Sequence, residues 1–455
     1  MTTTIMDPKL FPRRVRYAAL LTINVFVFMG NMYSSGLATG FENLGADLHV
    51  PFNKLADLIS WSVLAMGLSN LVWMPLALCF GKRPIVLISM AWFVAGCIWT
   101  AVAKDYGSLL GARVFASFGL GSIESIGPNM FYERDYASAM ATYALFLSGG
   151  SQIGPVIAGY LIKARGWRWF FILCIIIAAV NLVTTFFLLP ETTYEPEGEE
   201  QHLEPEKSVQ GHLESVPETR PPFDYRVYWK SLFTMGLSKE ARRRGPVKHF
   251  FYLLVLPFPM LMVPGVLLAS AMYGVALGAS AGLGLFTLSS FIGVLIAFPI
   301  AGPLTDYLSR FLRSRNKHNL HKPEHRLPAL IVPFIVSPIG VLVFGHAIAN
   351  RMHYAVPAVG QAMAASALAL VPSVMLSYVV DAYPRTSGEA LVLVNASKNV
   401  VAFGLAKGSY DWMAREGVWK MFAEFAGVQW AVFLMGAPLY FAGPWLRRRL
   451  GRYFD

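Results

Sequence analysis

Residues 169–190 read WFFILCIIIAAVNLVTTFFLLP, a run of 22 residues without a charged side chain. A helix rises about 1.5 Å per residue, so a run of this length matches the hydrocarbon core of a bilayer, which is about 30 Å thick. Similar apolar runs recur along the 455-residue chain. They predict helices that cross a membrane, because a helix satisfies its own backbone hydrogen bonds and lipid offers none.

The composition excludes most other classes of protein. Hydrophobic residues make up 55% of the chain and charged residues 14%, against about 25% charged in ordinary globular proteins. The mean hydropathy is +0.49. These values exclude a soluble domain, a disordered chain and a coiled coil. The three cysteines, Cys79, Cys97 and Cys174, lie inside apolar runs, which argues against a disulfide scaffold and favours small buried side chains.

The apolar runs predict an all-α polytopic membrane protein with twelve transmembrane helices in two six-helix halves. The first run has no cleavage site, so it is a span and not a removed signal peptide. The predicted spans are 17–38, 55–80, 84–103, 109–130, 137–162, 168–190, 250–272, 281–303, 328–348, 354–380, 389–410 and 421–446. The predicted domains are a terminus (1–16), a first half (17–190), a charged linker (191–248), a second half (249–446) and a basic tail (447–455).

The basic residues predict the orientation. With alternating spans, 27 of the 38 Lys and Arg residues fall on the side of both termini, which places these in the cytosol by the positive-inside rule. The same bias explains the net charge of +11 without a nucleic-acid partner. Lys163, Arg165 and Arg168 are the local exception.

The segment between the halves has two parts. Residues 191–218 carry nine glutamates and little apolar surface, which predicts a disordered cytosolic linker. After it, apolar side chains recur at helical spacing and predict an amphipathic helix over 225–233 on the inner leaflet. The alternative is a helix packed on the protein's own cytosolic face.

Two loop stretches resemble a motif of the major facilitator superfamily. They are FGKRPIVLIS (80–89), where Leu78 stands in place of the usual acid, and AGPLTDYLSR (301–310), which keeps the acid as Asp306. An acid at a helix end beside a basic loop makes a charge-assisted contact that locks the cytosolic gate. The resemblance therefore implies gating roles, which fall on Lys82, Arg83, Asp306 and Arg310.

Three further stretches extend the resemblance over nearly the whole chain. GARVFASFGLGS (111–122) is similar to the family's Arg-x-x-x-Gly motif, and GGSQIGPVIAGY (149–160) to the exporters' glycine-proline motif. In the latter, Gly150 and Gly154 allow close helix approach and Pro155 gives a flexible point. LPETTYEP with the segment 378–399 is similar to the fungal twelve-span drug:proton antiporter and polyamine-type branch. The resemblance implies two halves of inverted repeats that rock around a central site.

Ionisable groups inside spans are candidates for function, because each costs at least about 2.5 kcal/mol to insert. Glu124 and Arg113 share one face of the fourth span, about 16 Å apart, so they cannot pair directly. We predict that this face lines the cavity. Glu124 would accept a proton or contact a cation, and Arg113 would tune its pKa through water or substrate. The alternative is that each is tied to a neighbouring helix for packing.

Polar residues on two other spans complete the predicted pathway. Asn395, Lys398 and Asn399 share a face of the eleventh span and predict a polar substrate wall. Alternatively, Lys398 pairs with Glu124 or Asp57. Lys407 lies near the outer end and is expected to snorkel. In the first span, Asn24, Asn31 and Tyr33 predict a water-lined path, with helix–helix contacts as the alternative. In the second span, Trp61 predicts an aromatic contact in the binding cavity, with a lipid contact as the alternative.

No other chemistry stands out. His318, His321 and His325 have metal-like spacing, but six Lys and Arg in their loop oppose a divalent cation, so we expect no metal. The sequence has no Gly-x-x-x-x-Gly-Lys-[Ser/Thr] loop and no recognisable catalytic set. We therefore expect no enzyme and no cofactor, with an ion gradient as the driving force.

The expected function is secondary active transport, in the form of a proton-coupled exporter of small amphiphilic organic compounds at the plasma membrane. A proton-coupled importer of a polyamine or other organic cation is the first alternative. The scarcity of membrane acids beyond Glu124 favours export of neutral or weakly charged compounds. A non-transporting receptor on the same fold is the alternative of another class. The expected partners are the bilayer, the substrate and protons, and the chain is expected to be a monomer.

Overall fold

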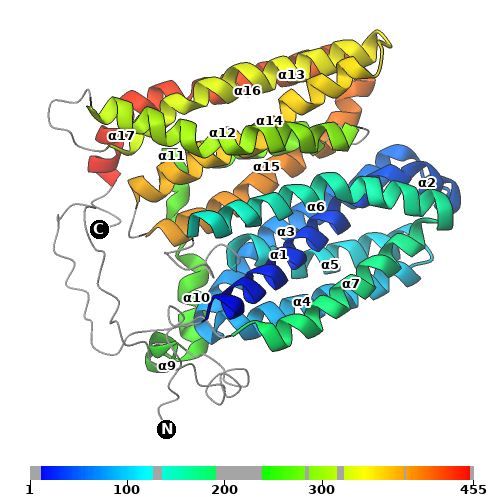
Figure 1. Cartoon of the computed structure of the whole chain (residues 1–455), viewed down its shortest axis with the longest axis horizontal. Helices are drawn as coiled ribbons and strands as arrows, with labels where there is room; N and C mark the ends of the chain where they lie inside the picture. Colours follow the sequence, from blue (N-terminus) through cyan, green and yellow to red (C-terminus); the bar gives the residue numbers. More distant parts are fainter. Residues whose placement is uncertain are drawn as a thin grey trace.

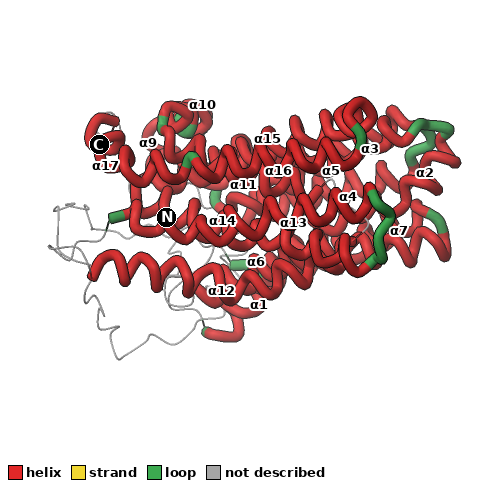
Figure 2. Tube along the Cα trace, turned by 90° about the horizontal axis from the view of Figure 1, so that it is seen from above, coloured by secondary structure: helices red, strands yellow, loops and turns green. Residues whose placement is uncertain are grey.

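A computed structural model describes residues 12–126, 136–190, 238–281, 286–314, 322–383 and 386–450. Within these ranges all regular elements are helices, which run mostly side by side, and no strand occurs (Figure 2). The first half consists of α1 (Arg13–Gly36), η2 (Leu37–Gly40), α2 (Phe41–Leu48), α3 (Phe52–Phe80), α4 (Lys82–Val102), α5 (Tyr106–Ile126), α6 (Tyr136–Arg165) and α7 (Trp167–Leu188).

The second half follows the charged linker. It consists of α9 (Lys239–Arg244), α10 (Pro246–Val255), η5 (Phe258–Met262), α11 (Pro264–Ala281), α12 (Thr287–Ser314), η7 (Pro323–Leu330), α13 (Ile331–Ala349), α14 (Ala355–Ala382), α15 (Ser387–Glu416), α16 (Val418–Leu434) and α17 (Gly436–Leu450). Figure 1 shows the two halves as two bundles, and they meet where α15 packs on α3 and α12 packs on α6.

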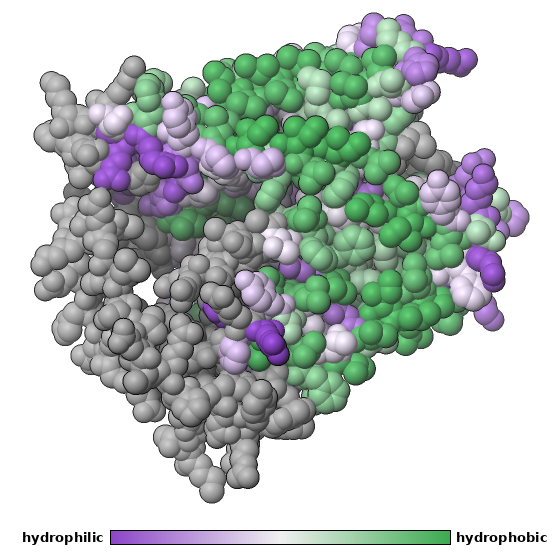
Figure 3. Space-filling model, in the orientation of Figure 1, coloured by the Kyte–Doolittle hydropathy of each residue, from purple (hydrophilic) through white to green (hydrophobic). Residues whose placement is uncertain are grey.

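The two ends of the bundle differ. We call the end at which α1 begins and α17 ends the terminal end, and the opposite end, which carries α2, the distal end (Figure 1). On the face shown in Figure 3, hydrophobic residues cover the middle of the helices and hydrophilic residues gather toward the ends. This distribution fits a bundle that crosses a membrane from end to end.

The number of candidate spans is roughly consistent with the expected twelve. Among the described residues, ten helices are long and apolar enough to cross a membrane, and the total reaches eleven if one bent pair is counted as a single span. The helix α5, which carries Arg113 and Glu124, is not among these candidates. It nevertheless packs between α3 and α4 inside the first bundle.

The predicted bounds of the seventh and eighth spans are wrong. The segment Pro246–Met262 is bent by 91° from Pro264–Gly278, so the seventh span begins at Pro264 instead of residue 250. Prolines at 257, 259 and 264 cause the break, since each lacks a backbone N–H and clashes with a continuing helix. The eighth span is α12, which starts at Thr287.

Some expectations lie outside the described residues. These are most of the charged linker, the amphipathic helix expected over 225–233, His318 and His321. His325 is described and lies buried in η7. No cluster of metal-ligating side chains occurs in the described part of the chain.

Candidate functional site

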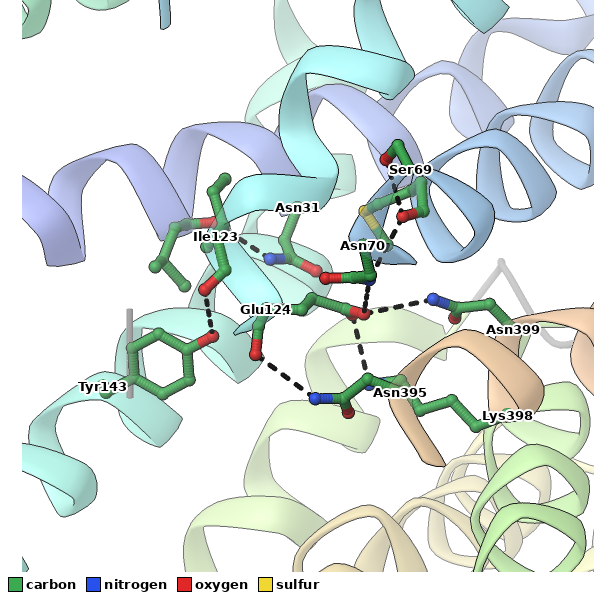
Figure 4. Close-up of polar contacts among 11 residues, drawn as sticks. Asn31, Ser69, Asn70, Ile123, Glu124, Tyr143, Asn395, Lys398 and Asn399 are labelled. Carbon is green, nitrogen blue, oxygen red and sulfur yellow. Dashed lines mark hydrogen bonds and ion pairs between the residues drawn. The ribbon is translucent and has the colours of Figure 1, made fainter. Parts of the chain in front are cut away.

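A buried ion pair joins the two halves. Glu124 on α5 places Oε1 3.1 Å from Nζ of Lys398 on α15. Its other oxygen, Oε2, accepts hydrogen bonds from Nδ2 of Asn70 on α3 at 3.2 Å and from Nδ2 of Asn399 on α15 at 3.1 Å (Figure 4). Only 8% of the Glu124 side chain and 5% of the Lys398 side chain is exposed. We call these four side chains the Glu124 cluster.

Three more side chains surround the cluster. The Lys398 ammonium lies over the Tyr273 ring of α11, 4.4 Å from its centroid. Asn395 donates to the backbone carbonyl oxygen of Glu124 at 3.2 Å, and the Tyr143 hydroxyl of α6 donates to the carbonyl of the preceding residue at 3.1 Å (Figure 4). Helices from both halves therefore converge on one carboxylate.

The chain geometry explains why α15 reaches Glu124. Residues 395, 398 and 399 follow i, i+3, i+4 spacing and so share one face of the helix. That face can approach α3 because Gly67 has no side chain: a Cβ there would lie 2.4 Å from Cβ of Asn399. A larger residue at position 67 would push the two halves apart at the level of the cluster.

The cluster balances charge but leaves two acceptors open. A lone buried charge is costly, whereas a paired and hydrogen-bonded one is tolerated. The amide oxygens Oδ1 of Asn70 and Asn399 are both buried and have no hydrogen-bond partner in the described part of the protein. Buried polar atoms normally find partners. The two oxygens can therefore accept hydrogen bonds from a water or substrate that enters the cluster.

The structure shows which acid pairs with Lys398. Its partner is Glu124, not Asp57. Asp57 instead pairs with Lys407 across the two halves, so the expectation that Lys407 snorkels to the headgroups is wrong.

Arg113 occupies a different place from Glu124. It is fully buried, and its guanidinium donates to the carbonyl oxygens of Leu58 on α3 at 3.0 Å and of Ser34 on α1 at 2.9 Å. It also lies over the Tyr33 ring, 5.0 Å from the centroid. Arg113 thus connects three helices of the first half. This arrangement matches the alternative in which Arg113 serves helix packing.

The other predicted pathway residues are scattered. Asn24 is buried on α1, and Asn31 donates to a carbonyl of its own helix at 2.9 Å. The Tyr33 hydroxyl shares a 2.8 Å hydrogen bond with Thr100 of α4. Trp61 packs against Phe403 of α15, with ring centroids 5.1 Å apart, and so lies between the halves on the distal side of the cluster.

Comparison with known proteins identifies the family. A family model described as Major Facilitator Superfamily matches residues 21–406. The chain belongs to the major facilitator superfamily. It is 24% identical to the probable efflux pump mfs2 of Aspergillus flavus over 81% of this chain and 88% of that protein. It is 25% identical to the MFS-type transporter penM of Penicillium rubens over 85% of this chain and 76% of that protein.

Solved structures share the fold. A POT family transporter in complex with 5-aminolevulinic acid matches with a TM-score of 0.68 and 13% identity, over 98% of this chain and 100% of that one. The xylose transporter XylE of E. coli, in a partially occluded inward-open conformation, matches with a TM-score of 0.64 and 11% identity over 92% and 97%. The chain is a membrane transporter of this superfamily, not an enzyme.

In the first-half copy of the loop motif, residues 80–89, the arginine makes hydrogen bonds within its own half. Arg83 is buried at the start of α4 and donates to the backbone oxygens of Leu189 at 2.6 Å and Phe186 at 2.8 Å. A cation there is favourable, because the C-terminal end of α7 carries partial negative charge. Lys82 is the first residue of the same helix, and Leu78 is partly exposed. Arg83 thus joins α4 to α7 within one half.

The second-half copy of the loop motif forms a charge network at the terminal end. Asp306 on α12 lies 3.3 Å from Arg326 of η7, which also contacts Asp381 on α14 at 2.6 Å. Arg310 donates to the backbone oxygen of Asp306 at 3.3 Å. The retained acid therefore links three elements of the second half through Arg326.

The glycine-proline motif packs α6 on α1. A Cβ at Gly150 would lie 2.2 Å from the backbone oxygen of Phe28, and one at Gly154 would lie 2.7 Å from Cα of Met32. The helix continues through Pro155, whose carbonyl accepts a hydrogen bond from the Thr39 hydroxyl at 3.2 Å. Both glycines are needed for this close approach.

Sequence reasoning missed several members of the site. Asn70 carries a usable signal, since a polar amide within the apolar second span is costly unless it has a partner. Tyr273, Tyr143 and Arg326 carry no such signal, because tyrosines are common in spans and arginines in loops. Only the packing of the helices brings them to their partners.

Proposed function

We propose that this protein is a proton-coupled secondary transporter that exports small amphiphilic organic compounds, with Glu124 as the proton-binding group. The observation that carries the proposal is the Glu124–Lys398 ion pair. Its two partners belong to different halves, which move relative to one another in alternating access. A contact across that boundary must break and re-form in each cycle.

Protonation supplies a way to break the pair. When Glu124 takes up a proton, it loses its charge and the attraction to Lys398 falls to that of an ordinary hydrogen bond. The Lys398 ammonium then keeps the Tyr273 ring as a neighbour. Release of the proton to the other side restores the pair. The proton gradient would thereby drive the change between the two states.

Two observations support export of compounds with little net charge. The paired site carries one negative and one positive group, so it favours neither anions nor cations strongly. One of the relatives, from Aspergillus flavus, bears the name probable efflux pump. The amide oxygens of Asn70 and Asn399, which have no partner in the described part of the protein, would accept hydrogen bonds from donor groups of the substrate.

Import of an organic cation is the second candidate. The position of the Lys398 ammonium between a carboxylate and an aromatic ring is a chemically complete site for an amine. A substrate ammonium could take that position once Lys398 moves away.

We further propose a monomer in the plasma membrane, with the terminal end in the cytosol. The excess of basic residues on the side of both termini supports this orientation.

The decisive experiment is flux in proteoliposomes. Uptake and efflux of a panel of labelled amphiphiles and polyamines are measured with an imposed pH gradient for the native protein, E124Q and E416Q. Glu416 is a matched control, because it is a partly exposed acid paired with Lys420 far from the cluster. We expect gradient-driven flux in the native protein and in E416Q, and none in E124Q.

Other results would redirect the assignment. Gradient-driven flux retained in E124Q contradicts the role of Glu124 in coupling. Polyamine uptake without amphiphile efflux favours the importer. Ligand binding without flux in any of the three proteins favours a receptor on the transporter fold.

A further inference from the structure

The segment α9–α10 lies across the terminal end instead of crossing the membrane. It precedes the 91° bend that separates Pro246–Met262 from α11, and Figure 1 shows α9 and α10 turned away from the common direction of the other helices. If α11 runs along the membrane normal, the segment before the bend lies parallel to the membrane surface.

The inner face of this segment is fixed to the first half. The backbone N–H of Ser238 donates to the carbonyl of Cys79 at the end of α3 at 3.2 Å, and the Ser238 side chain caps α9. Ala241 and His249 are buried in the contact, and α10 packs along α3. The segment α9–α10, which leads into the seventh span (α11), therefore packs against the second span (α3).

The outer face combines apolar and basic side chains. Val247, Phe251 and Val255 follow i, i+4, i+8 spacing, with 67%, 57% and 60% of their surface exposed. The exposed apolar surface continues beyond α10 to Met262, which is 78% exposed. The exposed basic residues of this segment are Arg242, Arg243, Arg244 and Lys248. The Arg244 guanidinium lies over the ring of Tyr252 on α10, 5.1 Å from its centroid.

We propose that this outer face of α9–α10 is a binding surface for anionic lipid headgroups in the leaflet at the terminal end. An in-plane helix with one apolar stripe and a flanking row of cations fits the boundary between acyl chains and headgroups. Three consecutive arginines and a lysine supply the charge that phosphatidylserine-type headgroups need. Neutral headgroups would engage only the apolar stripe.

The site has a mechanical consequence. The chain passes from α10 through η5 directly into α11, which carries Tyr273 of the candidate site. Lipid bound on the outer face would hold the start of the seventh span against α3. Binding of anionic lipid is independent of the proposed transport function, so the two can fail separately.

Lipid-dependent thermal stability of the purified full-length protein tests the proposal. Phosphatidylserine or phosphatidylcholine with the same acyl chains is titrated into detergent micelles, and the Tm is followed. A ligand that binds the folded state raises the Tm. We expect phosphatidylserine to raise it more than phosphatidylcholine, and R242Q/R243Q to weaken the apparent affinity for phosphatidylserine by about fivefold per arginine.

Two variants control for folding and net charge. K163Q/R165Q removes two exposed charges at the distal end and should keep the native lipid response. R242K/R243K keeps the charge at the terminal end and should also keep it. The proposal is overturned if phosphatidylserine and phosphatidylcholine act alike on the native protein, if R242Q/R243Q responds as the native protein does, or if K163Q/R165Q loses the response equally.

Discussion

Lys398 and Glu124 form a buried ion pair, with Nζ 3.1 Å from Oε1, that connects α15 of the second half to α5 of the first. Both charges lie deep in a bundle whose surroundings are lipid, where a single unpaired charge is costly. Neither half can therefore hold its member of the pair at this depth unaided. The two halves of the transporter are therefore stabilised together by this pair.

Removing one partner of this pair should destabilise the protein more than removing both. E124Q leaves a buried ammonium and K398M leaves a buried carboxylate, and each should lower the free energy of unfolding by about 3–5 kcal/mol. In E124Q/K398M no charge remains, so we expect a smaller loss than in either single variant. Thermal unfolding of the four proteins measures the coupling. Additive losses would contradict a direct pair.

Asp57 and Lys407 should act as a latch at the distal end. They pair across the halves next to the Trp61–Phe403 contact, and the pair is partly exposed, so its effect on overall stability should be under about 1 kcal/mol. Its loss should instead favour opening of the distal side. In an F403C background, D57N should raise the rate of maleimide labelling.

E416Q is the control for the latch, because it breaks a surface pair within one half. It should leave the labelling of F403C unchanged. Equal labelling in F403C and D57N/F403C would show that the pair has no gating role. The native cysteines Cys79, Cys97 and Cys174 are buried and should contribute little background.

Gly150 should tolerate no side chain, whereas its neighbour should. An added Cβ at Gly150 would lie 2.2 Å from the backbone oxygen of Phe28, but at Gly149 the nearest atom would be 3.6 Å away. G150A should therefore cost about 1–3 kcal/mol through overpacking, while G149A should be close to neutral. Thermal unfolding compares the two. A neutral G150A would mean that α1 and α6 separate easily.

Arg113 should matter for stability through its hydrogen bonds to two helices. Lysine keeps the charge but lacks the planar guanidinium of arginine, so it cannot donate to both carbonyl oxygens at once. We expect R113K to lower the Tm, while the molecules that remain folded still transport. R415K, at an exposed position, is the control and should have no effect. Loss of flux in R113K at an unchanged Tm would contradict the packing role and favour a place on the transport path.

Several features could be predicted from the sequence because they depend on the local chain. Apolar runs longer than a bilayer is thick have one stable arrangement in lipid, so residues 169–190 predicted a span that the structure places in α7. Buried ionisable residues are equally conspicuous, which is why Glu124 and Lys398 could be selected without knowing their neighbours. The prolines at 257, 259 and 264 also act through the local chain, and they break the helix before α11.

Tertiary structure alone decided which side chains meet. Helical spacing gives the face on which a residue lies but not the helix that the face contacts, since many arrangements of twelve helices bury the same stripes. The packing of α15 on α3 and α5 pairs Lys398 with Glu124 and Lys407 with Asp57. The tertiary structure also brings Asn70 and Tyr273 into the site. The sequence determined what had to be buried in the membrane, and the packing of the two halves determined its partner.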